Sequence, residues 1–97
     1  MTTANVEALI EIGIPGSRAL VRDRRGTGSH FEAVVIAPHF TGRSLVEQHR
    51  LVYQACGSRL KQDIHALQLQ TFNPTQWESA EKEGTRPWIW QPELNTT

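Results

Sequence analysis

The side chains best suited to chemistry in this 97-residue sequence are its four histidines and its single cysteine, Cys56. A cysteine thiolate can act as a nucleophile or a metal ligand, and a neutral imidazole is a common metal ligand. The sequence has no GxSxG, HExxH, Walker or CxxC motif that would position such groups for catalysis. We therefore predict that the chain is not an enzyme.

Cys56 follows Val52 by four residues, so both fall on one face of a predicted helix. A small apolar side chain belongs at that position, and free cysteine is among the most buried residue types. A buried structural thiol is therefore favoured over a catalytic nucleophile. With one cysteine the chain forms no internal disulfide, which fits a reducing cytosol, and we expect a cytoplasmic protein.

The histidines differ in their predicted settings. His39 lies in a predicted turn and is expected at the surface. His49 lies within a predicted helix, where we expect a hydrogen-bonded histidine at the edge of the core. His30 opens a predicted central strand and is expected to be structural.

His65 is the most promising ligand of the set. It begins a predicted strand directly after the polar residues 61–63, so its ring is expected near solvent at the end of the sheet. A neutral imidazole there is available to a metal. No second ligand stands at a coordinating spacing, so we expect the isolated chain to hold no cluster and no tightly bound metal.

Two glycine-containing stretches match the sequence patterns of phosphate- and RNA-binding loops but lack the structural setting that those loops require. Gly26-Thr27-Gly28 links two predicted antiparallel strands and does not lead into a helix N-terminus, so it lacks the dipole of a phosphate site. Gly13-Ile14-Pro15-Gly16 matches the GxxG pattern that KH domains use on RNA, but it follows a helix and precedes a strand. We therefore expect a hairpin turn and a helix end, respectively.

The charges balance overall but are unevenly distributed. Ten basic and ten acidic residues cancel, so bulk charge indicates neither a nucleic acid nor a membrane partner. Residues 17–61 nevertheless carry a net charge of +5, from eight Arg or Lys against three Asp or Glu. The residues that could form a DNA-contacting surface are Arg22, Arg24, Arg25 and Arg43. The alternative is that these are scattered, solvated charges.

Hydrophobic periodicity and capping residues predict the elements that position these side chains. The first helix has Val6, Leu9 and Ile10 on its buried face, with Glu7 and Glu11 outside. The helix that starts at Ser44 has a predicted buried stripe of Leu45, Val52, Ala55 and Cys56. The predicted elements are a helix at 3–12, a hairpin of strands at 17–23 and 30–37, the helix from Ser44, a short helical turn at 58–61, a strand at 64–72 and a last helix from Asn73 to Gly84, anchored by Trp77.

This order indicates an α+β fold with a three-stranded mixed sheet, with residues 30–37 as the central strand and the helices on one face. We expect one domain over residues 1–84. An extended tail over residues 85–97 contains Trp88-Ile89-Trp90. No apolar run approaches the length needed to cross a bilayer, and the first residues do not read as a targeting peptide.

Several motifs in a fixed order resemble the BolA-like family over about residues 4–78. They are His30-Phe31-Glu32-Ala33-Val34-Val35, Phe40-Thr41-Gly42, Gln48-His49-Arg50-Leu51-Val52-Tyr53, Ile64-His65-Ala66-Leu67 and Thr71-Phe72-Asn73-Pro74-Thr75-Gln76-Trp77. The resemblance implies a class II KH-like fold, in agreement with the element order. Members of that family also lack the GxxG loop of KH domains.

The resemblance further implies an interaction protein that pairs with a monothiol glutaredoxin and shares a [2Fe-2S] cluster with it. His65 matches the family's C-terminal histidine ligand, and the other ligands come from the glutaredoxin cysteine and from glutathione. Many members add a His or Cys from the loop between the first two strands, but residues 23–29 contain neither. His30 matches the strand-opening His-Phe pair of the family and is a weak second candidate.

Two functions are therefore compatible with the sequence. The leading one is an adaptor in [2Fe-2S] cluster trafficking or iron sensing that docks a monothiol glutaredoxin through a surface containing His65. The alternative is a DNA-binding transcriptional regulator of the BolA type, which the arginine surplus supports. A DNA surface would give an affinity that falls steeply with salt, because bound phosphates release counterions.

Overall fold

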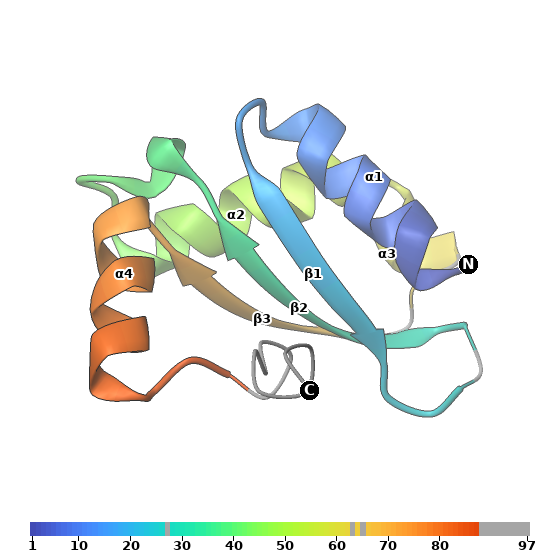
Figure 1. Ribbon diagram of the computed structural model, residues 1–97. Helices are drawn as coiled ribbons and strands as arrows, with labels where there is room; N and C mark the ends of the chain where they lie inside the picture. Colours follow the sequence, from blue (N-terminus) through green and yellow to red (C-terminus); the bar gives the residue numbers. More distant parts are fainter. Residues whose placement is uncertain (27, 63, 65, 88–97) are drawn as a thin grey trace.

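The computed structural model describes residues 1–26, 28–62, 64 and 66–87, and its elements follow the predicted order (Figure 1). They are α1 (Thr3–Gly13), β1 (Arg18–Asp23), β2 (His30–Ile36), the short 3-10 helix η1 (Pro38–Phe40), α2 (Leu45–Cys56), α3 (Arg59–Gln62), β3 (Ala66–Phe72) and α4 (Pro74–Glu83). The predicted α+β class is confirmed. No helix among these residues is long and apolar enough to span a lipid bilayer.

The three strands form one mixed sheet in the order β1-β2-β3. β1 and β2 pair antiparallel as the predicted hairpin, whereas β2 and β3 run parallel. The central place of β2 explains why both of its faces are apolar, since Phe31 and Val35 are buried on one face and Val34 on the other. The parallel register sets His30 beside Ala66, so β2 and β3 begin at the same end of the sheet.

One face of the sheet packs against α1 and α2 to form the core. Alternate residues of β2 point toward these helices, as the two-residue period of a strand requires. The buried cluster consists of Val6, Ile10, Ile14, Ala19, Val21, Phe31, Ala33, Val35, Ala37, Phe40, Val52, Cys56 and Ile64. Helices α1 and α2 thus occupy the face on which the helices were expected.

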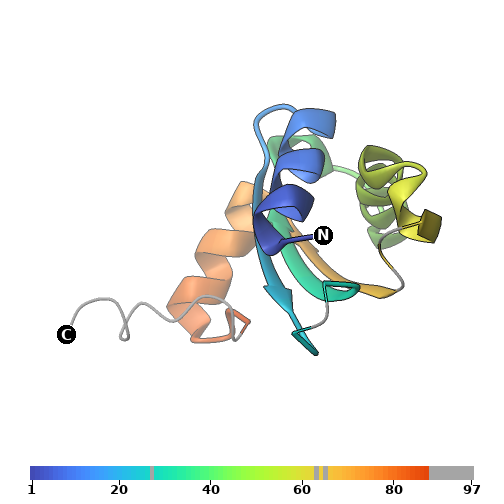
Figure 2. The ribbon, with the colours of Figure 1, turned by 90° about the vertical axis from the view of Figure 1, so that its right-hand side faces the viewer.

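Helix α4 lies on the side of the sheet opposite to α2 (Figure 2). Thr71 points toward α2, where its hydroxyl bonds to Gln48. The next residue, Phe72, therefore points to the other side, because successive strand side chains alternate. There it meets Trp77 of α4 edge-on, with ring centroids 5.1 Å apart. The expectation of helices on one face holds for α1 and α2 but not for α4.

Local capping explains where the last two long helices begin. Ser44 and Asn73 cap α2 and α4, and each helix has a reciprocal capping box, with Glu47 and Gln76 as the third helical residues. The backbone N–H and the hydroxyl of Ser44 hold the pKa of Glu47 below its ordinary value. Gly84 ends α4 as predicted, and it does so in the left-handed conformation, which a residue without a Cβ adopts readily.

The predicted placement of Leu45 is wrong, and that of Glu7 holds only in part. Leu45 is 61% exposed, because it is the first residue of α2 and precedes the part of the helix that reaches the sheet. Val52 and Cys56 are buried as predicted. Glu11 is exposed, but Glu7 is half-buried, and both carboxylates bond to the backbone of β1 instead of pointing only into solvent.

Trp77 anchors α4 as predicted. Arg86 stacks on its ring at 4.2 Å from the centroid, donates to its backbone oxygen at 3.1 Å and pairs with Glu81. These contacts hold Arg86, which follows the helix end, against α4. The next residue, Pro87, is buried. The predicted tail, including Trp88-Ile89-Trp90, lies largely outside the described residues, so the domain boundary at residue 84 stays a prediction.

Candidate functional site

The end of the sheet where β2 and β3 begin brings together segments that are distant in the sequence. The N–H of Ala66 donates to the backbone oxygen of Ser29 at 3.2 Å, which ties the start of β3 to the β1–β2 loop. Ile64 is fully buried and donates its N–H to the Arg59 oxygen at 2.8 Å. His65, between these two residues, lies outside the described residues. Its described neighbours lead to the end of the sheet beside the loop.

The β1–β2 loop is organised by one carboxylate. Asp23 accepts the N–H groups of Arg25 and Gly26 through one oxygen and that of Gly28, at 2.7 Å, through the other. Gly26 and Gly28 have φ angles of 68° and 76°, which only glycine adopts without strain. The predicted hairpin is confirmed by the antiparallel pairing of β1 and β2, and the chain after Gly28 continues into β2 and not into a helix. The Asp23 carboxylate serves the loop backbone.

His30 lies within this end of the sheet and is half-buried. Its Nδ1 and the hydroxyl of Ser29 lie 2.9 Å apart, within hydrogen-bond distance. That contact fixes the ring beside the first residues of the parallel pair. The structural role predicted for His30 agrees with this contact.

The other two histidines are elsewhere. His39 is exposed in η1, beyond the opposite end of β2, as predicted. His49 is half-buried on α2, and its buried Nε2 atom has no hydrogen-bond partner among the described residues. Among the described residues, no partner for the predicted hydrogen bond of His49 lies at this nitrogen. Helical spacing placed the ring near the core but carried no information about a partner from another element.

No group of three or more His, Cys, Asp or Glu side chains within residues 1–26, 28–62, 64 and 66–87 is arranged to hold a metal ion. A [2Fe-2S] cluster needs four protein or small-molecule ligands. Among the described residues, this end of the sheet offers His30 together with an Asp23 carboxylate already bonded to the loop. The described residues at this end of the sheet thus do not form a complete ligand set for such a cluster.

Cys56 is 2% exposed and belongs to the core cluster, as predicted. Burial raises the pKa of its thiol, because the thiolate is poorly solvated inside the protein. Little of the nucleophilic form is thus present at neutral pH.

We therefore expect slow reaction of Cys56 with a thiol reagent in the native state. Unfolding in denaturant should accelerate labelling by at least about tenfold, because the reagent then reaches the sulfur and the thiol pKa returns toward its ordinary value. Labelling followed by mass spectrometry measures both rates. Rapid stoichiometric labelling of the folded protein would contradict the structural role.

The predicted basic surface is divided between two places. Arg22 and Arg24 both pair with Glu32 of β2, at 3.2 Å and 2.9 Å. Arg25 lies beside them in the exposed loop. Arg43 follows η1, beyond the far end of β2, and donates to the backbone oxygen of His39. Sequence proximity grouped the first three correctly, but the fold separates Arg43 from them and partly neutralises the group with Glu32.

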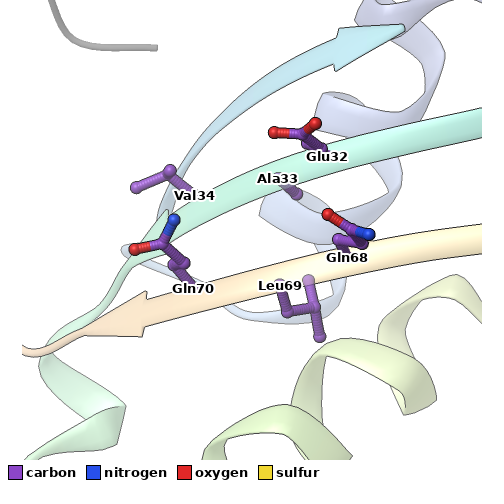
Figure 3. A pocket seen from close by; sticks show the side chains of 6 residues that line it. All are labelled: Glu32, Ala33, Val34, Gln68, Leu69 and Gln70. Carbon is purple, nitrogen blue, oxygen red and sulfur yellow. The ribbon is translucent and has the colours of Figure 1, made fainter. Parts of the chain in front are cut away.

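The face of the sheet that α1 and α2 do not cover has a shallow polar cleft between β2 and β3 (Figure 3). Glu32, Gln68 and Gln70 present their polar groups there beside Val34, as Figure 3 shows. Its volume is about 80 Å³, which corresponds to a few water molecules. The cleft is therefore too small for a cofactor or a drug-sized ligand.

Comparisons with known proteins agree with this architecture. A family model described as BolA-like protein matches residues 15–76. The solved structure of a BolA homologue from Coxiella burnetii is 44% identical, with a TM-score of 0.72, and the match covers 80% of this chain and 97% of that one. Yeast Fra2 is 27% identical with a TM-score of 0.67, covering 90% of this chain and 95% of that one.

A curated relative, the DNA-binding transcriptional regulator BolA of Haemophilus influenzae, is 32% identical over 68 residues. That alignment covers 70% of this chain and 66% of the relative. The matches span between 38% and 66% of the length of the curated relatives. The family model covers all three strands and α2, and the solved homologues share the same fold. This chain belongs to the BolA-like family.

Proposed function

We propose that this protein is a non-enzymatic adaptor that pairs with a monothiol glutaredoxin and contributes His65 to a [2Fe-2S] cluster held between them. Membership of the BolA-like family supports an interaction protein. The observation that carries the proposal is the convergence at one end of the sheet. There Ala66, which follows His65, pairs with His30 and bonds to Ser29 of the β1–β2 loop.

A ligand at that end of the sheet does not have to fill the core. Ile64 fills it, with no exposed surface, immediately before His65. Position 64 is thus occupied by a core residue, and Ala66 begins β3 at the end of the sheet. We infer that a partner approaching this end of the sheet binds through the imidazole of His65.

The cluster in this proposal is cargo shared by two proteins. An imidazole in place of a thiolate raises the potential of a [2Fe-2S] cluster, as in other His-ligated clusters. His65 would supply one nitrogen, and the glutaredoxin cysteine and glutathione would supply the remaining ligands. Since residues 23–29 contain no His or Cys, the loop contributes none of the usual second ligands, and His30 is the alternative donor from this chain.

DNA binding is the second candidate, because curated relatives are named DNA-binding transcriptional regulators. The exposed Arg25, beside Arg24 in the β1–β2 loop, is the observation that favours it. Against it, Arg22 and Arg24 share Glu32, and Arg43 lies beyond the other end of β2. A row of cations that follows a phosphate backbone is thus not formed by these four residues.

One titration series separates the two functions. Adding the protein to a cluster-loaded monothiol glutaredoxin should change the visible circular dichroism and saturate at one protein per glutaredoxin. A fluorescently labelled DNA duplex, titrated at increasing salt, should show no strong binding. An unchanged cluster spectrum, together with DNA affinity that falls steeply with salt, would reject the adaptor and favour the regulator.

A further inference from the structure

The β1 strand is an edge of the sheet, yet two of its outward backbone groups are already bonded. The N–H of Ala19 donates to a carboxylate oxygen of Glu11, and the N–H of Val21 donates to one of Glu7, each at 3.0 Å. Both carboxylates belong to α1, which packs beside β1 (Figure 1). Edge strands usually leave such donors open to another strand.

The spacing of the two pairs matches the geometry of the two elements. Residues four apart in a helix are separated by about 6 Å along its axis. Outward-facing groups two residues apart in a strand are separated by about 6.8 Å. Glu7 and Glu11 therefore stand in step with Val21 and Ala19. Their inward neighbours Val6 and Ile10 are fully buried, so the position of the helix on the sheet is fixed by the core.

We propose that Glu7 and Glu11 close the β1 edge and keep the protein from adding a second copy of itself as a fourth strand. Their oxygens take the positions that the carbonyl oxygens of an added strand would occupy. A carboxylate also forms a stronger bond to N–H than a neutral carbonyl does, so an incoming strand must displace the better acceptor. The two carboxylates therefore occupy, from within the same chain, the edge at which another strand would pair.

The other side of β1 identifies what self-pairing would bring together. Arg18, Leu20 and Arg22 alternate with the buried Ala19 and Val21. In an antiparallel pair of two β1 strands centred on Leu20, Ala19 would face Val21 of the second copy. Arg18 would then face Arg22 of the second copy, and like charges opposite each other are unfavourable. Pairing of two β1 strands should therefore depend on the charges at positions 18 and 22, whereas other kinds of association should not.

The test uses the full chain with Glu7→Ala/Glu11→Ala. Amide exchange at Ala19 and Val21, measured by NMR in dilute solution, should accelerate at least tenfold. Sedimentation at rising concentration should show a dimer that the wild type does not form. Adding Arg18→Glu to this variant should lower the dimer dissociation constant several-fold, because opposite charges then face each other across the strands.

The matched control is Glu78→Ala/Glu83→Ala, which removes the same charge from exposed positions of α4. It should stay monomeric with unchanged exchange at Ala19 and Val21. Glu7→Gln/Glu11→Gln keeps an acceptor oxygen at each position and should retain most of the protection. If the double alanine variant does not fold, Glu11→Ala alone should accelerate exchange at Ala19 and not at Val21.

A folded Glu7→Ala/Glu11→Ala variant that remains monomeric at all concentrations would overturn the proposal. A dimer that Arg18→Glu weakens would overturn the β1–β1 pairing. Neither result depends on a glutaredoxin, so the closed β1 edge and the proposed adaptor function are tested independently.

Discussion

Replacing His65 with alanine is expected to abolish the change that this protein causes in the visible circular dichroism of a cluster-loaded monothiol glutaredoxin. The spectrum reports the asymmetric surroundings of the irons, so it responds when an imidazole enters the coordination sphere. Docking uses a wider surface than one ring, and calorimetry should therefore still detect much of the binding. Unchanged far-ultraviolet dichroism of the variant would show that the fold is intact.

The control is His39→Ala, which removes an exposed imidazole beyond the opposite end of β2. It should leave the cluster spectrum as the wild type does. If the His65 variant perturbs the cluster just as the wild type does, the ligand assignment is wrong. His30→Ala would then be the next variant, because His30 lies at the same end of the sheet and contacts Ser29 through Nδ1.

Gln48→Ala is expected to lower the free energy of unfolding by about 2–4 kcal/mol. Gln48 is 4% exposed, and its amide nitrogen donates to the backbone oxygens of Phe40 and Arg43 at 3.2 Å and 3.1 Å. Its amide oxygen accepts the hydroxyl of Thr71 at 2.6 Å. Truncation leaves these buried groups without their partner, which costs more than the loss of a solvated bond.

Urea denaturation measures this effect. Gln54→Ala, on an exposed position of the same helix, should change the free energy by no more than about 0.5 kcal/mol. Thr71→Val combined with Gln48→Ala should cost less than the sum of the single changes, since the two side chains bond to each other. Equal destabilisation by the Gln48 and Gln54 variants would show that the buried amide does not hold η1 and β3 to α2.

Much of the fold follows from local chemistry and was predicted from the sequence. The caps at Ser44 and Asn73 need only a short side chain and the next three residues, so they can be recognised without the tertiary structure. The buried position of Cys56 follows from helical spacing behind Val52. The central place of β2 follows from its apolar residues on both faces.

The same local reasoning identified the candidate site only in part. The motif around residues 64–67 indicates His65, and the composition of residues 23–29 shows that no loop ligand stands there. Arg43 is separated from the other arginines because β2 carries the chain to the opposite end of the sheet before η1, which the predicted strand at 30–37 already implied. The sequence could not show, however, that Arg22 and Arg24 share one carboxylate across the hairpin.

The tertiary structure alone decided which side chains meet over long sequence distances. Glu7 and Glu11 read as the solvated face of an amphipathic helix, yet the packing of α1 beside β1 brings them to the edge of the strand. Gln48 of α2 likewise meets Thr71 of β3 only because the two elements pack together. Periodicity reports which face of an element is buried, whereas the partner of a polar group depends on how two elements pack.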